Sequence, residues 1–222
     1  MRVEWHGQSA FSLAGEAGKV LIDPFGDVSA LAARGIRFEY PAIAAADVDL
    51  LLVTHEHLDH NGVEAVAGEP ALLRSTAGRL GSPLGEVTAI ASEHDAAAGT
   101  ERGPNTIFAF ALDGLRVAHF GDFGQAGLRP EQAAALGAVD LLFLPVGGGP
   151  TVGAVAAAEI ALSLSPTWVV PMHYRTPRID FLETEEEFVR AIGREHRPGG
   201  PSFETADLPR GEAPLAVVPA AP

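Results

Sequence analysis

One short segment restricts what this chain can fold into more than any other. It places three histidines and an aspartate within six positions, directly after the strand-like run 48–53. On extended backbone, His55, His57 and Asp59 would point the same way, because alternate side chains share one face of a strand. His60 departs from this alternation and can point elsewhere. The pattern His-x-His-x-Asp-His suits two neighbouring metal ions better than a structural histidine cluster, so the sequence predicts a metal site here.

The composition predicts one globular domain that spans 1–222, with 219–222 as a frayed tail. Hydrophobic residues make up 47% of the 222 positions, which is enough for a sizeable core. No apolar run approaches the roughly 18 residues of a membrane helix, and the chain does not start with a basic and then apolar leader. We therefore expect a cytoplasmic protein without membrane association. The absence of cysteine excludes disulfides, thiolate metal ligands and cysteine nucleophiles.

The charge balance restricts the partners. Fifteen basic and 29 acidic side chains give a net charge of −14. Such a field repels phosphate backbones, so we expect no nucleic-acid binding. A small anionic substrate remains compatible with this charge, because bound metal ions reverse the local sign.

The order of predicted elements indicates two packed sheets with helices outside them. Strands come first in meanders and then alternate with helices, a pattern typical of layered α/β and α+β folds. The long segment 25–46 has no sustained periodicity, so we expect it to cover a site or to form an interface in a homo-oligomer. Strands are predicted at 2–5, 10–13, 19–22, 48–53, 71–73, 86–91, 106–112, 115–119, 139–144, 168–171 and 215–218. Helical segments are predicted at 63–67, 75–80, 130–136, 151–164 and 184–194, with Thr151 and a Thr184–Glu187 capping box at two of the helix starts.

Three later side chains share one property with the histidine motif. His94, Asp122 and His173 each follow an apolar strand and stand near glycine or proline. Since strand ends can meet at one edge of a sheet pair, we expect these groups to converge on the His55–His60 loop. Asp23 also ends a strand, and two interpretations stay open for it: a group beside the metals, or a turn-forming aspartate before proline.

Five motifs in this order give the chain a resemblance to a known family. They are Leu21–Pro24, Thr54–Gly62, Ala118–Asp122, Leu144–Gly148 and Pro171–Tyr174. Together they resemble the metallo-β-lactamase-fold hydrolases, and most closely the branch that contains the ascorbate-phosphate lactonase and many uncharacterised metal-dependent hydrolases. The resemblance covers nearly the whole chain. It implies a four-layer αββα sandwich with the metals at one edge of the paired sheets.

The resemblance also implies which residues bind the metals. One ion would be held by His55, His57 and His94, the other by Asp59, His60 and His173, with Asp122 bridging the two. Nitrogen and oxygen donors of this kind suit Zn²⁺, which we expect, and also accept Mn²⁺ or Fe. His119 competes with His94 for the third position at the first ion, and both remain open.

One position departs from the family. Members of this branch commonly have histidine in the first turn, where this chain has Gln8. Glutamine can hydrogen-bond but cannot transfer a proton near neutral pH. The sugar-phosphate specificity of the lactonase is therefore not carried over to this chain.

The expected chemistry is metal-assisted hydrolysis of a small ester, lactone or phosphodiester. Two cations about 3.5–4 Å apart lower the pKa of a shared water toward about 7, and the resulting hydroxide attacks the substrate. Asp59 would bind metal through one oxygen and orient the nucleophile or carry a proton with the other. Tyr174 is a candidate substrate contact, and Arg175 is either such a contact or a surface charge. The alternatives are a non-hydrolytic redox or sensory metal protein and a nuclease, whereas the absence of Gly-x-Ser-x-Gly argues against a serine hydrolase.

Overall fold

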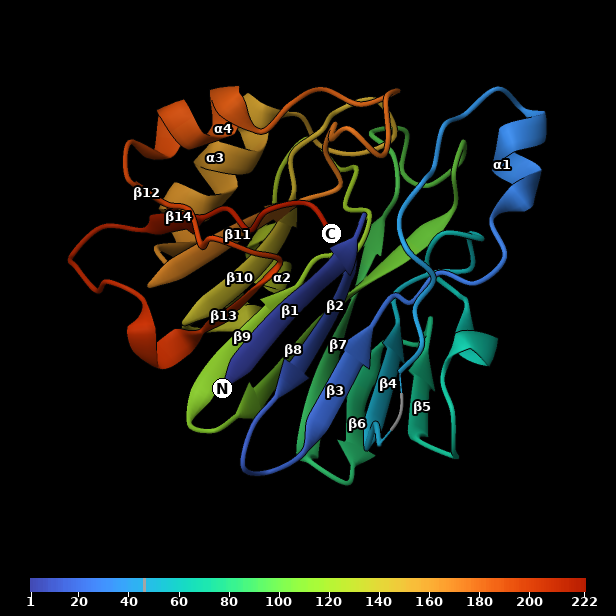
Figure 1. The fold of residues 1–222 in the computed structure, drawn as a ribbon. Coiled ribbons are helices and arrows are strands. Elements are labelled where there is room, and N and C mark those ends of the chain that lie inside the picture. The colour runs from blue at the N-terminus through green and yellow to red at the C-terminus, as the bar shows by residue number, and fades with distance from the viewer. Residues whose placement is uncertain (46) are drawn as a thin grey trace.

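Two β-sheets lie face to face at the centre of the molecule, which the computed structural model describes for residues 1–45 and 47–222 (Figure 1). Both sheets contain parallel and antiparallel neighbours. The six-stranded sheet has the order β13 (Ser202–Glu204), β1 (Arg2–Gly7), β2 (Ala10–Ala14), β3 (Lys19–Ile22), β4 (Leu50–Val53) and β5 (Ala71–Arg74). The eight-stranded sheet has the order β12 (Glu195–His196), β14 (Leu215–Val217), β11 (Trp168–Met172), β10 (Leu141–Pro145), β9 (Leu115–His119), β8 (Pro104–Leu112), β7 (Gly85–Glu93) and β6 (Gly78–Ser82).

Large apolar side chains fill the space between the sheets. Along β1, Val3 and Trp5 are buried while their sequence neighbours are partly or fully exposed, as the two-residue period of a strand requires. Phe11 of β2 meets Phe143 of β10 with ring centroids 4.5 Å apart, so this pair joins the two sheets directly. The inner face of each sheet thus belongs to one shared hydrophobic core.

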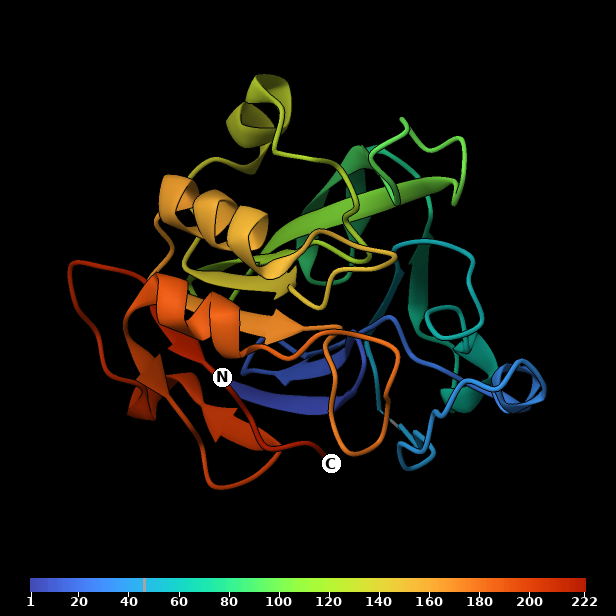
Figure 2. The ribbon, with the colours of Figure 1, turned by 90° about the horizontal axis from the view of Figure 1, so that it is seen from above.

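Helices cover the outer face of the eight-stranded sheet. They are α2 (Pro130–Leu136), α3 (Ala154–Leu164) and α4 (Glu186–Ile192), which contact β7, β10 and β14 respectively (Figure 2). The predicted class, an α/β sandwich of two packed sheets with helices outside, is confirmed.

The outer face of the six-stranded sheet has a different cover. Phe25, Tyr40 and Ile43 pack there in a second apolar cluster with Leu21 and Leu51, whose side chains point away from the shared core. The segment that supplies these residues is irregular, as predicted, apart from the short helix α1 (Ser29–Ala33), which buries none of its residues. The last position of the predicted 25–46 segment, residue 46, lies outside the described residues. An oligomer interface on this segment stays a prediction.

Several apolar strands end at the same edge of the sheet pair. The pairings make β1 and β3 antiparallel to β2, and β4 parallel to β3, so β1, β3 and β4 run in one direction. In the other sheet, β7, β9, β10 and β11 likewise run in one direction. This shared direction brings residues from distant parts of the sequence to one edge.

The structure corrects four local predictions. The helix predicted at 75–80 is wrong, because β6 pairs there with β7, and Gly78 has a φ of +135° that no helix accepts. The helix predicted from Thr151 begins at Ala154, and the Thr151 hydroxyl donates to the carbonyl of Gly148 instead of capping it. The predicted Thr184–Glu187 capping box is also wrong, since α4 begins at Glu186 without a side-chain cap. The helical turns expected at 63–67 shrink to the single 3-10 turn Val63–Ala65.

The C-terminal residues are held by the rest of the chain. Pro219 is buried, and the N–H of Ala220 donates to the carbonyl of Gly200 at 3.1 Å. The carbonyl of Pro222 accepts a hydrogen bond from Arg178 Nε at 3.0 Å. The expectation of a frayed tail at 219–222 therefore does not match the structure. None of the helices in the described part of the chain is both long and apolar enough to cross a membrane.

The inter-sheet contact gives a stability prediction. Replacement of Phe143 by alanine should lower the free energy of unfolding by about 3–5 kcal/mol, because it leaves a cavity between the sheets. The control is Leu72→Ala on β5, where the side chain is 43% exposed and the change should stay within about 0.5 kcal/mol. Denaturant unfolding of both variants measures this, and similar losses for the two would contradict the assigned core.

Candidate metal centre

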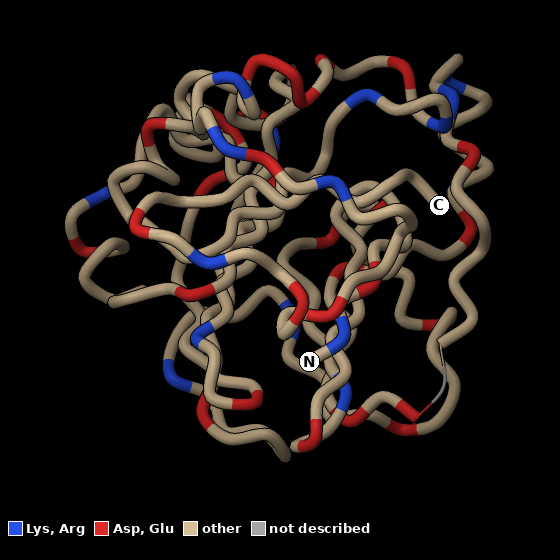
Figure 3. The backbone as a smooth tube through the Cα atoms, turned by 60° about the vertical axis from the view of Figure 1, so that its left-hand side comes forward, with Lys and Arg blue, Asp and Glu red and all other residues tan. Residues whose placement is uncertain are grey.

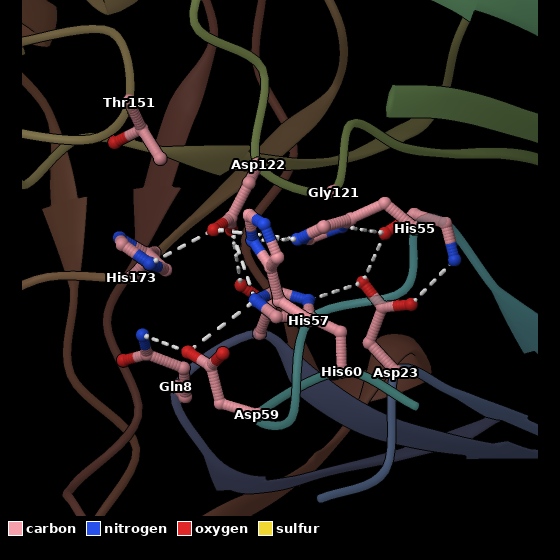
Figure 4. A network of polar contacts seen from close by, with 12 residues as sticks. Gln8, Asp23, His55, His57, Asp59, His60, Gly121, Asp122, Thr151 and His173 are labelled. Atoms are coloured by element: carbon pink, nitrogen blue, oxygen red, sulfur yellow. Dashed lines mark hydrogen bonds and ion pairs between the residues drawn. The ribbon is translucent and has the colours of Figure 1, made fainter. Parts of the chain in front are cut away.

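Six strand ends meet where the two sheets open toward the same edge (Figure 4). Each is followed by a polar side chain that turns toward a common centre. Those labelled in Figure 4 are Gln8 after β1, Asp23 after β3, the histidines of the His55–His60 loop after β4, Asp122 after β9 and His173 after β11. The sixth is His94 after β7, whose Nε2 lies 3.1 Å from Asp122 Oδ2. The structure therefore shows the predicted convergence of distant strand ends on the histidine loop.

The carboxylate of Asp122 lies at the middle of this group. Its Oδ2 is 3.1 Å from His94 Nε2, 3.2 Å from His173 Nε2 and 3.9 Å from His55 Nε2. Its Oδ1 is 3.2 Å from His60 Nε2. Burial by itself opposes ionisation of Asp122, but the neighbouring imidazoles of His173 and His60 outweigh burial and hold the pKa of this carboxyl well below its usual range.

Three of these histidines are oriented through their second ring nitrogen. The Nδ1 atom of His60 lies 2.9 Å from Asp23 Oδ2. The Nδ1 of His94 lies 3.0 Å from the carbonyl of Pro150, and the Nδ1 of His55 lies 3.0 Å from the hydroxyl of Thr54. An outer hydrogen bond of this kind fixes a ring so that its other nitrogen faces the metal. In each case the Nε2 atom is left to point at the centre.

Asp23 does more than form a turn. Its Oδ1 accepts a hydrogen bond from the Thr54 N–H at 2.8 Å, and its Oδ2 accepts one from the Thr54 hydroxyl at 2.7 Å. The same Oδ2 faces His60, so a single carboxylate links β3 to the start of the histidine loop. Of the two interpretations of Asp23, the structure favours a group that supports the centre.

Two sets of donor atoms match the two ion sites that the family resemblance implies. Within each set the donor atoms lie within 4.8 Å of one another. The sets are His55, His57 and His94, and Asp59, His60 and His173. A third set of Asp23, His55 and His60 also meets this distance, but Asp23 already accepts three hydrogen-bond contacts. The assignment of each residue to an ion stays a prediction.

The donor set fits a divalent metal. Among the described residues, three buried side-chain atoms lack a hydrogen-bond partner, and all three belong to this centre: Gln8 Oε1, His60 Nε2 and His173 Nδ1. A buried polar atom without a partner raises the free energy of the folded state, and a cation bound at this centre would give His60 Nε2 a partner. Burial lowers the pKa of His55 and of His57, which favours the neutral imidazole that binds metal.

The structure brings His94, and not His119, to the centre. Both ring nitrogens of His119 contact backbone: Nε2 lies 2.9 Å from the carbonyl of Ser9, and Nδ1 accepts the N–H of Gly121 at 3.1 Å. Gly121 has a φ of +55°, and a Cβ there would lie 2.4 Å from Asn105 Oδ1. This glycine therefore lets the chain turn after β9 so that Asp122 reaches the centre while His119 stays behind it.

Two predicted substrate contacts do not reach the site. Tyr174 is buried, and its ring packs against Trp5 with centroids 5.4 Å apart. Arg175 is exposed, and its Nε donates to the carbonyl of Leu182. Neither lines the cavity above the centre, so the structure gives no support to a substrate role for them.

A cavity of about 410 Å³ lies above the centre. Part of its wall consists of His57, Asp59, His94, Asp122 and His173. Other residues of the wall lie outside the metal-binding motifs: Leu31, Arg34 and Ile36 in and after α1, Glu101 and Arg102 in the loop after β7, and Phe181. The first three belong to the segment 25–46, which the sequence predicted to cover a site or to form an interface. No spacing pattern links these residues to the histidine motif, since only the folded chain brings them together.

Glu56 also lines the cavity, but its carboxylate is engaged outside the centre. Arg74 Nε lies 2.8 Å from Oε1, and the Ser75 hydroxyl donates to the same oxygen at 2.7 Å. The hydrogen bonds from Arg74 lower the pKa of Glu56 to about 2. Glu56 is thus a persistent anion paired with Arg74, although it stands inside the motif.

The placement of the two competing histidines is testable by metal analysis. The His94→Ala variant should bind metal at least roughly tenfold more weakly than the wild type does, because an inward-facing donor is lost. Protein with His119→Ala should retain the wild-type metal content, since that ring contacts only backbone at its nitrogens. Inductively coupled plasma mass spectrometry after dialysis against a weak chelator measures both, and the reverse order would contradict the geometry.

Comparison with known proteins identifies the family. A family model described as "Beta-lactamase superfamily domain" matches residues 2–173. A UPF0173 metal-dependent hydrolase of Thermococcus kodakarensis is 31% identical over 220 residues, which cover 87% of this chain and 92% of the relative. A second one, from Methanoculleus marisnigri, is 31% identical over 220 residues and covers 87% of this chain and 89% of the relative.

The fold agrees as well. A solved structure from Thermotoga maritima, provisionally named a Zn-dependent hydrolase of the metallo-β-lactamase superfamily, has a TM-score of 0.77. It is 24% identical, and the match covers 99% of both chains. The chain therefore belongs to the β-lactamase superfamily, as a metal-dependent hydrolase with the metallo-β-lactamase fold.

Proposed function

We propose that this hydrolase uses two divalent metal ions, with zinc as the native metal, to cleave a small ester, lactone or phosphodiester. The observation that carries the proposal is the buried Asp122 carboxylate, which lies within 3.9 Å of inward-facing nitrogens on four histidines. A carboxylate with donors on both oxygens is suited to bridge two cations. When bound, two such ions supply an activated water and polarise the oxygen of the electrophile.

Asp59 is the side chain best placed to handle the proton. Its Oδ2 accepts a hydrogen bond from Gln8 Nε2 at 3.1 Å and lies 3.7 Å from His60 Nε2. Within the described chain its Oδ1 has no hydrogen-bond partner, and the residue lines the cavity. One oxygen is thus held in place while the other is open to the substrate, as a group that orients water or carries a proton requires.

Gln8 holds Asp59 without titrating. It is fully buried and has a φ of +52°, an uncommon conformation for a residue with a side chain. An amide at this position fixes the carboxylate orientation but cannot exchange protons near neutral pH. The role of proton carrier therefore falls to Asp59 in this chain.

Zinc is proposed from the donor chemistry. Imidazole nitrogens and carboxylate oxygens, with no sulfur, suit zinc and also accept manganese or iron. The provisional name of the Thermotoga maritima relative, which includes Zn dependence, supports the same choice.

A small-molecule substrate fits the surface better than a nucleic acid does. The net charge is −14, and acidic and basic positions are interspersed along the backbone in Figure 3. Binding of a phosphate backbone would need a basic stripe. A cavity of about 410 Å³ is within the usual range for small-molecule sites.

The role of Asp59 is tested by Asp59→Asn. With 4-nitrophenyl acetate and bis(4-nitrophenyl) phosphate as probes, we expect kcat to fall by about 10²–10⁴-fold on whichever probe the wild type hydrolyses. Metal content measured on the same samples separates loss of proton transfer from loss of metal. Glu69→Gln, at an exposed position in the loop before β5, is the matched control and should keep wild-type kcat.

Two results would contradict the proposal. One is absence of hydrolysis of both probes by zinc-, manganese- and iron-loaded wild type. The other is an Asp59→Asn variant that retains full metal and full kcat.

A further inference from the structure

We infer that the substrate carries an anionic group apart from its scissile bond, joined to it by an apolar body, and that Arg34 and Arg102 bind this anionic group. The inference rests on the proposed hydrolase function and specifies its substrate class. It follows from the part of the cavity wall outside the metal centre, which carries both cationic and apolar side chains.

The two arginines stand out because they lack partners. Most arginines elsewhere in this acidic chain pair with carboxylates, hydroxyls, backbone carbonyls or an aromatic ring, as in Arg37 with Asp180 and Arg210 over Trp168. In the described part of the chain, three arginine side chains have no hydrogen bond, ion pair or ring contact: Arg34, Arg102 and Arg190. Arg190 lies on α4, whereas Arg34 and Arg102 line the same cavity. A chain with a charge of −14 could readily pair them, so two unpaired guanidinium groups at one cavity point to a ligand.

The backbone of Arg102 is held in place relative to the metal centre. Asp95, which directly follows His94, is buried, and its two oxygens accept hydrogen bonds from four backbone N–H groups of the next loop. These groups belong to Ala97, Gly99, Glu101 and Arg102, at 2.8, 2.8, 3.1 and 2.8 Å. The loop is thus tied at its start to His94 and at its end to the residue that presents the guanidinium.

Arg34 lines the cavity from the α1 segment, together with apolar side chains. It follows α1, and Leu31 and Ile36 beside it line the cavity although α1 buries none of its residues in the core. Leu58 and Phe181 complete the rim and are 49% and 43% exposed. Large apolar side chains gathered at a cavity mouth mark a binding surface. The body of the substrate that meets them is therefore apolar.

Two acidic residues on the wall do not cancel this charge. Glu56 is paired with Arg74, as described above. Glu101 also lines the cavity and forms no ion pair with Arg102 among the described residues, and its single negative charge offsets only one of the two arginines. Guanidinium groups bind carboxylate and phosphate through charge-assisted, often bidentate hydrogen bonds. Carboxylates and phosphates both bind guanidinium groups in this way, and the scissile group itself binds at the metal centre.

The test compares esters that differ only at the far end. The probes are 4-nitrophenyl hexanoate, the mono-4-nitrophenyl ester of adipic acid and 4-nitrophenyl 5-phosphonopentanoate, which end in methyl, carboxylate and phosphonate. Wild-type protein should have a higher kcat/KM for an anionic ester than for the hexanoate. The ratio of anionic to neutral kcat/KM should fall roughly tenfold in Arg102→Gln and in Arg34→Gln, and should weaken with added salt. The better of the two anionic esters identifies the anion as carboxylate or phosphate-like.

The matched control is Arg37→Gln. It removes the same charge three positions from Arg34, but its guanidinium faces Asp180 at 3.6 Å and does not line the cavity. The ratio should stay at the wild-type value in this variant. An equal loss in all three variants would indicate a general charge effect and would overturn the inference.

A binding measurement separates this inference from the proposed function. By calorimetry on metal-loaded protein, adipate should bind more tightly than hexanoate, and the difference should disappear in Arg102→Gln and Arg34→Gln. If this difference is present but no ester is hydrolysed, the proposed function fails and the inference stands. If esters are hydrolysed without preference for an anionic end and adipate binds like hexanoate, the inference fails and the function stands.

Discussion

The buried carboxylate of Asp122, surrounded by imidazoles from four histidines, is the interaction on which the rest of this structure depends. A single ionised carboxylate 2% exposed would be strongly unfavourable without compensating groups. The compensation comes from residues of both sheets, so the sheets must pack in one particular way for the centre to form. Asp23 and His173 hold left-handed backbone conformations, with φ of +48° and +51°, to place their side chains there. Backbone strain of this kind concentrates at functional sites and persists because the surrounding structure maintains it. Since a bound metal would stabilise this arrangement further, metal binding and folding should be coupled.

The molecule divides its tasks between regular and irregular structure. Strand ends supply the inward-facing donors, and fixed acceptors such as Asp23 and the Pro150 carbonyl orient them. The cavity walls instead come from the α1 segment, the loop held by Asp95 and the segment that includes Phe181. Loops on a rigid scaffold can change the substrate without disturbing the metal centre. This division explains why the reaction type is clear from the donors, while the substrate class has to be inferred from the walls.

Local sequence patterns predicted the fold class and most strands. β3 and β9 agree with their predicted bounds because their apolar runs end at strong turn signals. The predicted donors also come together, since each follows an apolar strand.

Local patterns failed where the contact that decides the structure joins residues far apart in the chain. The strand β6 is stabilised by pairing with β7, which a helix-like local pattern does not reveal. The competition between His94 and His119 could not be resolved either, because it depends on the turn at Gly121 and on the backbone of Ser9. Arg34 lies in the segment 25–46 that the sequence predicts to cover a site or form an interface, but no pattern singles out Arg34 or Arg102, since their lack of partners is a property of the folded molecule.

The central claim is that Asp122 lies between two metal ions. Anomalous X-ray diffraction on crystals of metal-loaded protein, collected above and below the absorption edge of the bound metal, tests this claim most directly. We expect two peaks about 3.5–4 Å apart. One should lie among His55, His57 and His94, and the other among Asp59, His60 and His173, with the Asp122 carboxylate contacting both. A single peak, or peaks that the Asp122 carboxylate does not touch, would contradict the account.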